Sequence, residues 1–225
     1  MCDITSDIDS CAVLPETQTM TVVAKAQVQD DSTAIVLGLL GYSATKLWNT
    51  AVWESTEIWK STGKILSSYD MDRHIKEARP VWYRCLHSQS AQAVLEELGG
   101  AYRSWFALRK KGDERAHPPG FRKRTTLSPV TFKQSAVFWD PAGRTVRLSI
   151  PKGTYGRQFV TLKVTLPPDA IVTNDAVQIA RLVYEKGDWY IHLTQKIVVP
   201  EQKGAGETMA LDLNIKHLAG SFCTD

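Results

Sequence analysis

The sequence contains few cysteines, and they lie far apart. With four cysteines among 225 residues and no Cys-x-x-C pair, the chain offers neither a disulfide scaffold nor a zinc site of its own. This usage favours a reducing compartment. The five histidines show no metal-ligand spacing, so no role is assigned to them. The cysteines are Cys2, Cys11, Cys85 and Cys223.

Long apolar runs and a secretion signal are also missing. No apolar run approaches the length needed to cross a bilayer, so we expect no membrane partner. The acidic start Met1–Asp7 lacks the basic residues that open a signal peptide, and a cytoplasmic location is expected. The apolar fraction of 43% is ordinary for a globular protein with one large domain or two small ones.

Charge is unevenly distributed along the chain. Between residues 103 and 133, nine Lys or Arg residues stand against two acids, a net charge of +7, whereas residues 1–31 carry −5. A focused basic segment on a near-neutral protein favours a polyanionic partner. The alternative is a solvated charged face. For Arg109, Lys110 and Lys111, interaction with the dipole at a helix end is an equally good explanation.

Hydrophobic periodicity predicts a strand and three helices in the first half of the chain. Apolar residues recur at spacings of three, four and seven between Leu37 and Ile58, as on one face of a long helix. We expect Ser32 to cap its N-terminus and Gly63 to end it. The predicted elements are a loose tail at 1–19, a strand at 21–28, and helices at about 33–62, 71–78 and 88–111.

Beyond Pro118 the period changes from helical to alternating. Alternation with short turns, such as 140–143 and 185–188, is typical of a small antiparallel barrel or sandwich. One strand before the helices and several after them indicate a helical block inserted into a β domain. The expected strands span 130–133, 136–139, 144–150, 159–166, 177–184 and 189–199, and a flexible linker at 204–206 follows them.

A single carboxylate stands inside the last apolar run of the chain. Asp212 lies within Met209–Ala219, which has the composition of a buried strand. An ionised side chain costs several kcal/mol to bury unless a cation or hydrogen bonds compensate it. A divalent metal held at a strand end, as in two-metal phosphodiester hydrolysis, is one explanation. An Asp that caps the backbone or faces solvent is the other.

Three segments carry a family resemblance. Leu47–Ala51 is similar to an aromatic-Asn-x-Ala signature. A Ser/Gln-rich helix start at 88–92 and an aromatic helix end at 102–106 lead to Pro119–Arg124, similar to a Pro-x-Phe-Lys-Lys turn. The Asp212 segment is close to the pattern Gly-Ile-Asp-Leu-Gly-x-Lys-x-Leu-Ala. In this order the segments resemble the TnpB (OrfB) family of transposon-encoded, RNA-guided DNA endonucleases, relatives of the compact type V CRISPR effectors.

The resemblance covers most of residues 20–222 and implies an α+β fold. It implies an OB-like antiparallel β-barrel called the wedge, an inserted helical recognition domain, and then an RNase H-like nuclease domain called RuvC. The matching ranges are 20–30 and 115–200 for the wedge, 31–114 for the helical domain and 206–225 for the start of RuvC. It also implies a prokaryotic protein whose partners are a guide RNA and double-stranded target DNA.

Two departures from the family pattern concern the nuclease. Asn214 stands where the family usually has glycine, and the family's later Glu, Asp and Cys-rich zinc ribbon are missing. The resemblance implies that Asp212 is a catalytic Mg²⁺ ligand in a partial site, with Mg²⁺ expected only for the complete nuclease. We therefore expect no cleavage by this polypeptide alone, and a second chain that supplies the rest of the domain is an additional candidate partner.

Charge density and the resemblance together predict contacts to nucleic acid near the helix-to-strand loop. Basic side chains neutralise phosphates and release counterions without reading sequence. Seven residues are expected to do so: Arg109, Lys110, Lys111, Arg115, Arg122, Lys123 and Arg124.

Polar side chains at the start of the third helix are candidate base readers. They are Ser88, Gln89 and Gln92, since Gln can pair bidentately with adenine. The alternative is a capped helix start with polar side chains in water. Trp139 and Trp189 border turns, where stacking on unpaired bases competes with a place in the core.

The sequence leaves three functions open. The leading one is the nucleic-acid-binding N-terminal part of a TnpB-like RNA-guided endonuclease. The second is a stand-alone, non-catalytic DNA- or RNA-binding protein, and the third is a decayed transposase fragment. Whether the chain is an enzyme stays open, because the lineage is that of a RuvC nuclease while the active site is incomplete.

Overall fold

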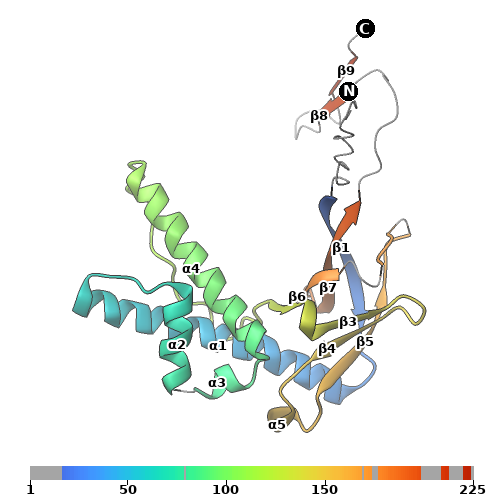
Figure 1. Ribbon diagram of the computed structural model, residues 1–225, viewed down its shortest axis with the longest axis horizontal. Helices are drawn as coiled ribbons and strands as arrows, with labels where there is room; N and C mark the ends of the chain where they lie inside the picture. Colours follow the sequence, from blue (N-terminus) through green and yellow to red (C-terminus); the bar gives the residue numbers. More distant parts are fainter. Residues whose placement is uncertain are drawn as a thin grey trace, which may run out of the picture. The chain divides into compact units, whose positions relative to one another are not determined.

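The computed structural model describes residues 17–78, 80–168, 170–173, 177–198, 209–212 and 220–223. Residues Thr19–Ile197 form one unit (Figure 1). Its fold is mixed α+β, with four helices between the first strand and the remaining strands. In chain order the elements are β1 (Thr17–Gln27), α1 (Asp31–Thr62), α2 (Ser68–Ala78), α3 (Val81–Arg84), α4 (Ser88–Lys110), β2 (Val130–Lys133), the 3₁₀ turn η1 (Gln134–Ala136), β3 (Val137–Asp140), β4 (Thr145–Ser149), α5 (Lys152–Tyr155), β5 (Phe159–Thr165), β6 (Val177–Glu185) and β7 (Asp188–Val198).

The long helix α1 has defined ends. Asp30 is its N-cap: its backbone is extended, and its carboxylate accepts a hydrogen bond from the Thr33 N–H at 2.7 Å. The prediction that Ser32 caps the helix was wrong, because Ser32 lies inside the first turn and donates its hydroxyl to Asp30. At the other end Gly63 adopts φ 66°, the left-handed conformation that ends a helix, as predicted.

The helices pack around a shared apolar stripe. The predicted stripe of α1 is buried from Leu37 to Ala51, and Ile58 is partly buried. The α2 helix packs on α4 where α4 carries Gly99. A Cβ atom at Gly99 would lie 3.3 Å from the Cβ atom of Ser68, so this glycine provides room for the start of α2. The same glycine lowers the intrinsic helix propensity of α4.

Seven antiparallel strands form a sheet that curls into a half-barrel. The strand order is β2-β6-β7-β1-β5-β4-β3. The two edge strands, β2 and β3, are consecutive in the chain and are joined through η1. The segment 130–140 therefore pairs with β6 through its first half and with β4 through its second half. This arrangement confirms the antiparallel β-structure expected from the alternating pattern.

Buried residues alternate with more exposed ones along the strands, as expected where one face of a sheet covers a core. In β5, for example, Val160, Leu162 and Val164 are buried and their neighbours are exposed. Trp139 and Trp189 are buried as well, and the indole N–H of Trp139 donates to the carbonyl of Val172 at 3.0 Å. Both tryptophans therefore belong to the core.

A separate antiparallel pair lies in the last part of the chain. It consists of β8 (Met209–Asp212) and β9 (Gly220–Cys223), with Asp212 opposite Gly220. Of the segment 209–219 that is predicted to be a buried strand, residues 209–212 form a strand, and residues 213–219 lie outside the described residues. The linker at 204–206 and residues 1–16 of the predicted tail lie outside the described residues, whereas residues 17–19 of that tail belong to β1.

The cap of α1 should make stability depend on pH. Hydrogen bonds from Ser32 and Thr33 lower the pKa of Asp30 from 3.8 to about 2. The charged cap therefore stabilises the fold fully above about pH 4, and its contribution is lost as the pH falls towards 2. We expect the difference in urea-unfolding free energy between the wild type and Asp30→Ala to shrink over that range.

The matched control is Asp30→Asn, which keeps a capping oxygen but does not titrate. Its stability difference from Asp30→Ala should stay constant over the same range of pH. A difference between the wild type and Asp30→Ala that is equally constant would contradict the role of the carboxylate.

Candidate nucleic-acid interface

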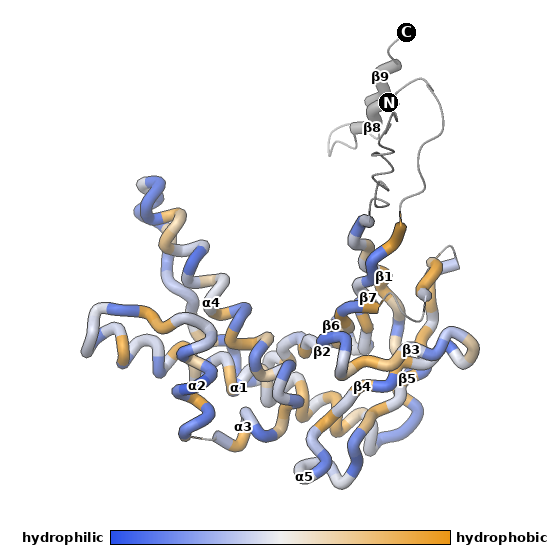
Figure 2. The backbone as a smooth tube through the Cα atoms, in the orientation of Figure 1, coloured by the Kyte–Doolittle hydropathy of each residue, from blue (hydrophilic) through white to orange (hydrophobic). Residues whose placement is uncertain are grey.

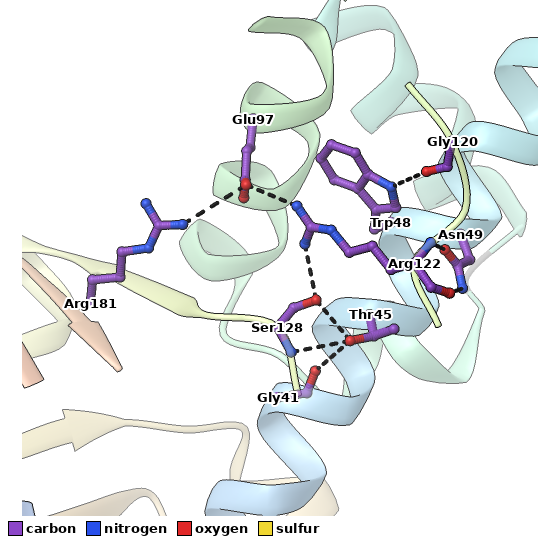
Figure 3. A network of polar contacts seen from close by, with 9 residues as sticks. All are labelled: Gly41, Thr45, Trp48, Asn49, Glu97, Gly120, Arg122, Ser128 and Arg181. Carbon is purple, nitrogen blue, oxygen red and sulfur yellow. Dashed lines mark hydrogen bonds and ion pairs between the residues drawn. The ribbon is translucent and has the colours of Figure 1, made fainter. Parts of the chain in front are cut away.

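The loop between α4 and β2 carries most of the predicted basic residues, and it follows the helices closely. The indole N–H of Trp105 in α4 donates to the carbonyl of Ala116 at 3.1 Å. Further along, the indole N–H of Trp48 in α1 donates to the carbonyl of Gly120 at 3.0 Å (Figure 3). The loop therefore runs back along α4 and is then attached to α1.

The amide side chain of Asn49 fixes the loop at Arg122. The Asn49 Nδ2 donates to the carbonyl of Arg122 at 3.0 Å, and the Arg122 N–H donates to Asn49 Oδ1 at 2.8 Å. One side chain thus satisfies both backbone groups of a loop residue, as a neighbouring strand would. This pairing joins the aromatic-Asn-x-Ala segment to the Pro-x-Phe segment, 73 residues apart in the chain.

Arg122 is held on three sides (Figure 3). Its guanidinium carbon lies 3.7 Å from the ring centroid of Trp48. Its Nη2 donates to Glu97 at 2.8 Å and its Nη1 donates to the Ser128 hydroxyl at 3.0 Å. The side chain is 20% exposed. These contacts make Arg122 a positioning residue of the loop, and its predicted contact with phosphate stays a prediction.

A second set of hydrogen bonds fixes the end of the loop. The Thr45 hydroxyl lies 2.6 Å from the carbonyl of Thr126 and accepts from the Ser128 N–H at 3.1 Å. The Ser128 N–H also lies 3.1 Å from the carbonyl of Gly41. A Cβ atom at Gly41 would lie 3.1 Å from the Cβ atom of Leu127. The absence of a side chain at Gly41 therefore lets the loop approach α1 closely.

Acidic residues of α4 connect this network to the sheet. Glu97 accepts from Arg122 and lies 3.8 Å from the guanidinium of Arg181 in β6. The neighbouring Glu96 pairs with Lys133 in β2 at 2.8 Å. The loop is thereby held relative to both the helices and the half-barrel.

Beside Arg122 the surface has a shallow hollow of about 460 Å³, lined by cationic and polar side chains. Arg124 lines this hollow and is exposed. Lys46 of α1 also lines it, and the ammonium of Lys46 lies 5.0 Å from the ring centroid of Tyr42. Phe121 is 64% exposed at the same place. The sequence analysis missed Lys46 and Phe121. Two features of the sequence could have pointed to them: positions 46, 49 and 50 share one helix face, and position 121 is an aromatic residue inside the basic loop.

The other predicted basic residues form a separate group at the end of α4. Arg109, Lys110, Lys111 and Arg115 are all exposed, and Figure 2 shows a hydrophilic tip at this end of the helix. Arg109 donates to the carbonyl of Glu114 at 2.9 Å. From Glu97 to Arg109 the helix rises about 18 Å. The structure therefore divides the predicted basic cluster into two groups.

The candidate base readers lie near the opposite end of α4. Ser88 is exposed, Gln92 is half-buried, and the side-chain oxygen of Gln89 accepts a hydrogen bond from the Ser135 hydroxyl at 2.9 Å. Gln89 therefore links α4 to η1. It lies about 30 Å along the helix axis from Arg109, so the structure does not bring these two predicted sites together. The adjacent His87 has a lowered pKa because it is partly buried, which favours its neutral form.

The predicted metal ligand can be located only by its backbone. Asp212 is the last residue of β8, and its side chain is outside the described part of the structure. Among the residues that were searched, which exclude the undescribed ones, no group of three or more His, Cys, Asp or Glu side chains could hold a metal ion. The role of Asp212 stays a prediction.

A scan against models of known protein families finds no match for this chain, and a search of curated proteins finds none that matches. Within the part of the chain that the structure describes, no helix has the length and apolar character needed to cross a membrane.

Removing the amide of Asn49 should loosen the loop. We expect Asn49→Ala to lower the free energy of unfolding by about 1–3 kcal/mol, because two backbone groups of a partly buried residue lose their partner. Urea denaturation followed by circular dichroism measures this loss. Thr56→Ala is the control on the same helix, since the Thr56 hydroxyl bonds within α1 to the carbonyl of Val52. A loss no larger than that of the control would show that the pairing does not hold the loop.

Proposed function

We propose that this chain is the nucleic-acid-binding part of a TnpB-like RNA-guided DNA endonuclease. In this proposal the half-barrel is the wedge domain, helices α1–α4 are the recognition domain, and β8 is the first strand of a RuvC domain. The chain would hold a guide RNA and double-stranded target DNA. The observation that carries the proposal is the contact between two segments of the family resemblance, through Asn49 and Arg122.

This contact supports the proposal because it gives two segments of the family resemblance a structural role: together they fix the basic loop. Trp48 and Asn49 hold the loop, and Arg122 fills the space between Trp48 and Glu97. The residues on either side of Arg122 are left exposed. A protein that binds phosphates needs its basic loop in a defined position, so a signature that fixes this loop agrees with the proposal.

Two groups of cations are the proposed phosphate contacts. The first consists of Arg124 and Lys46, which line the hollow beside Arg122, and of the exposed Lys123 between Arg122 and Arg124 in the chain. The second consists of Arg109, Lys110, Lys111 and Arg115 at the end of α4. Such side chains give affinity and orientation without reading the base sequence. The exposed ring of Phe121 would add a stacking surface for an unpaired base.

Neutralising the first group should weaken binding in a salt-dependent way. For a fluorescent 20-base-pair DNA duplex, we expect Lys123→Ala/Arg124→Ala to reduce the slope of log affinity against log salt concentration by about 2, because two phosphate contacts are lost. Fluorescence anisotropy between roughly 50 and 200 mM NaCl measures the slope.

The control for this experiment is Lys152→Ala/Lys186→Ala, which removes the same charge from α5 and from the β6–β7 turn. Its slope should equal that of the wild type. If both double variants gave the same slope, net charge alone would explain the effect, and the proposed interface would be wrong.

The proposal assigns one carboxylate, Asp212, to metal binding, whereas two-metal hydrolysis needs several ligands around the ions. Supercoiled plasmid incubated with the chain and Mg²⁺ should therefore remain uncut on an agarose gel. Nicking that requires Mg²⁺ and disappears in Asp212→Ala would overturn this expectation. Sequencing of RNA that copurifies with the chain would separate a guided protein from a plain DNA-binding one.

A further inference from the structure

Three adjacent strands present two phenylalanines and an arginine on the outer face of the half-barrel. Phe138 in β3 and Phe159 in β5 are 46% and 37% exposed, and Arg147 in β4 lies between them in an exposed position. Their neighbours in sequence, such as Leu148 and Val160, are buried on the opposite face. The three residues therefore belong to the solvent side of the sheet.

The register of the strands places these side chains together. Phe138 is the cross-strand partner of Arg147, and Phe159 is the partner of Ser149, two residues further along β4. The two rings meet edge to face with centroids 6.1 Å apart. The guanidinium carbon of Arg147 lies 4.6 Å from one centroid and 4.8 Å from the other. The group is an ordered aromatic platform with a cation at its centre.

The outward positions of β3, β4 and β5 carry two cations, Arg147 and Lys163, and one acid. Neither Arg147 nor Lys163 of β5 forms an ion pair with a side chain in the described part of the chain. The acidic residue among the outward positions of β3, β4 and β5 is Asp140, which lies at the end of β3. An anionic partner with flat apolar surfaces is complementary to such a face.

We infer that this face binds an unpaired segment of RNA. Bases would stack on Phe138 and Phe159, and phosphates would pair with Arg147 and Lys163, the combination by which sheets bind single strands. A duplex stacks the faces of its bases inside the helix, so it offers these rings no free base to stack on. The hydroxyl side chains beside the rings can bond to ribose 2′-hydroxyls, which favours RNA over DNA. They are Thr145, Ser149 and Thr161.

This inference goes beyond the proposed function because it concerns a surface that shares no residue with the basic loop. The two can fail separately. The basic loop is tested with duplex DNA, whereas the platform is tested with single-stranded RNA.

The test measures binding of the full chain to a fluorescent, unstructured 12-nucleotide RNA by anisotropy. We expect Phe138→Ala/Phe159→Ala to raise the Kd at least about tenfold, since each stacked base contributes substantially to binding. Phe138→Trp/Phe159→Trp should retain the affinity. Val23→Ala removes an exposed apolar side chain from β1 on the same outer face and should also leave the Kd unchanged. Thermal unfolding of each variant verifies that it is folded.

Three results would overturn the inference. The first is an unchanged Kd for a folded Phe138→Ala/Phe159→Ala variant, and the second is no binding of this RNA by the wild type. The third is equal affinity for DNA of the same sequence, which would remove the assignment to RNA. If the RNA result holds while Lys123→Ala/Arg124→Ala leaves duplex binding unaltered, the proposed interface fails and the platform stands.

Discussion

The reciprocal hydrogen bonds between Asn49 and the backbone of Arg122 are the constraint on which the basic loop depends. A loop that carries several like charges has little reason to lie against a helix, because its cations are better solvated apart. The amide of Asn49 offers the loop both a donor and an acceptor at one point. With that point fixed, the neighbouring bonds from Trp48 and Thr45 can form at little additional loss of chain entropy.

Fixing the loop also separates the roles of adjacent cations. Arg122 is turned towards Trp48 and Glu97, where an acid compensates its charge, whereas Lys123 and Arg124 remain exposed. One arginine is thus used to orient its neighbours. Because Glu97 also approaches Arg181 in β6, the orientation is transmitted to the sheet. The helices and the half-barrel are held together by polar contacts as well as by their shared apolar core.

Regular elements could be predicted from the sequence because their periodicity is local. The strands β4, β5 and β6 fall within a residue of their predicted limits, and Gly63 ends α1 as expected. Short elements such as α3 and α5 span a single turn and leave no period to detect. The roles of Arg122 and Gln89 could not be predicted, since their partners Glu97 and Ser135 lie 25 and 46 residues away. A charge run by itself does not show which of its members is paired.

The division of the basic residues into two groups sets a condition on the proposed nucleic-acid ligand. The first group adjoins Arg122, which pairs with Glu97. The second group begins at Arg109, about 18 Å further along α4 than Glu97. Duplex DNA advances about 3.4 Å for each base pair, so a duplex lying along α4 would have to span about five base pairs to reach both groups. A shorter ligand, or one that crosses the helix, can contact a single group at a time. Cations spaced in this way favour an extended polyanion over a small anion, because a small anion gains nothing from the second group.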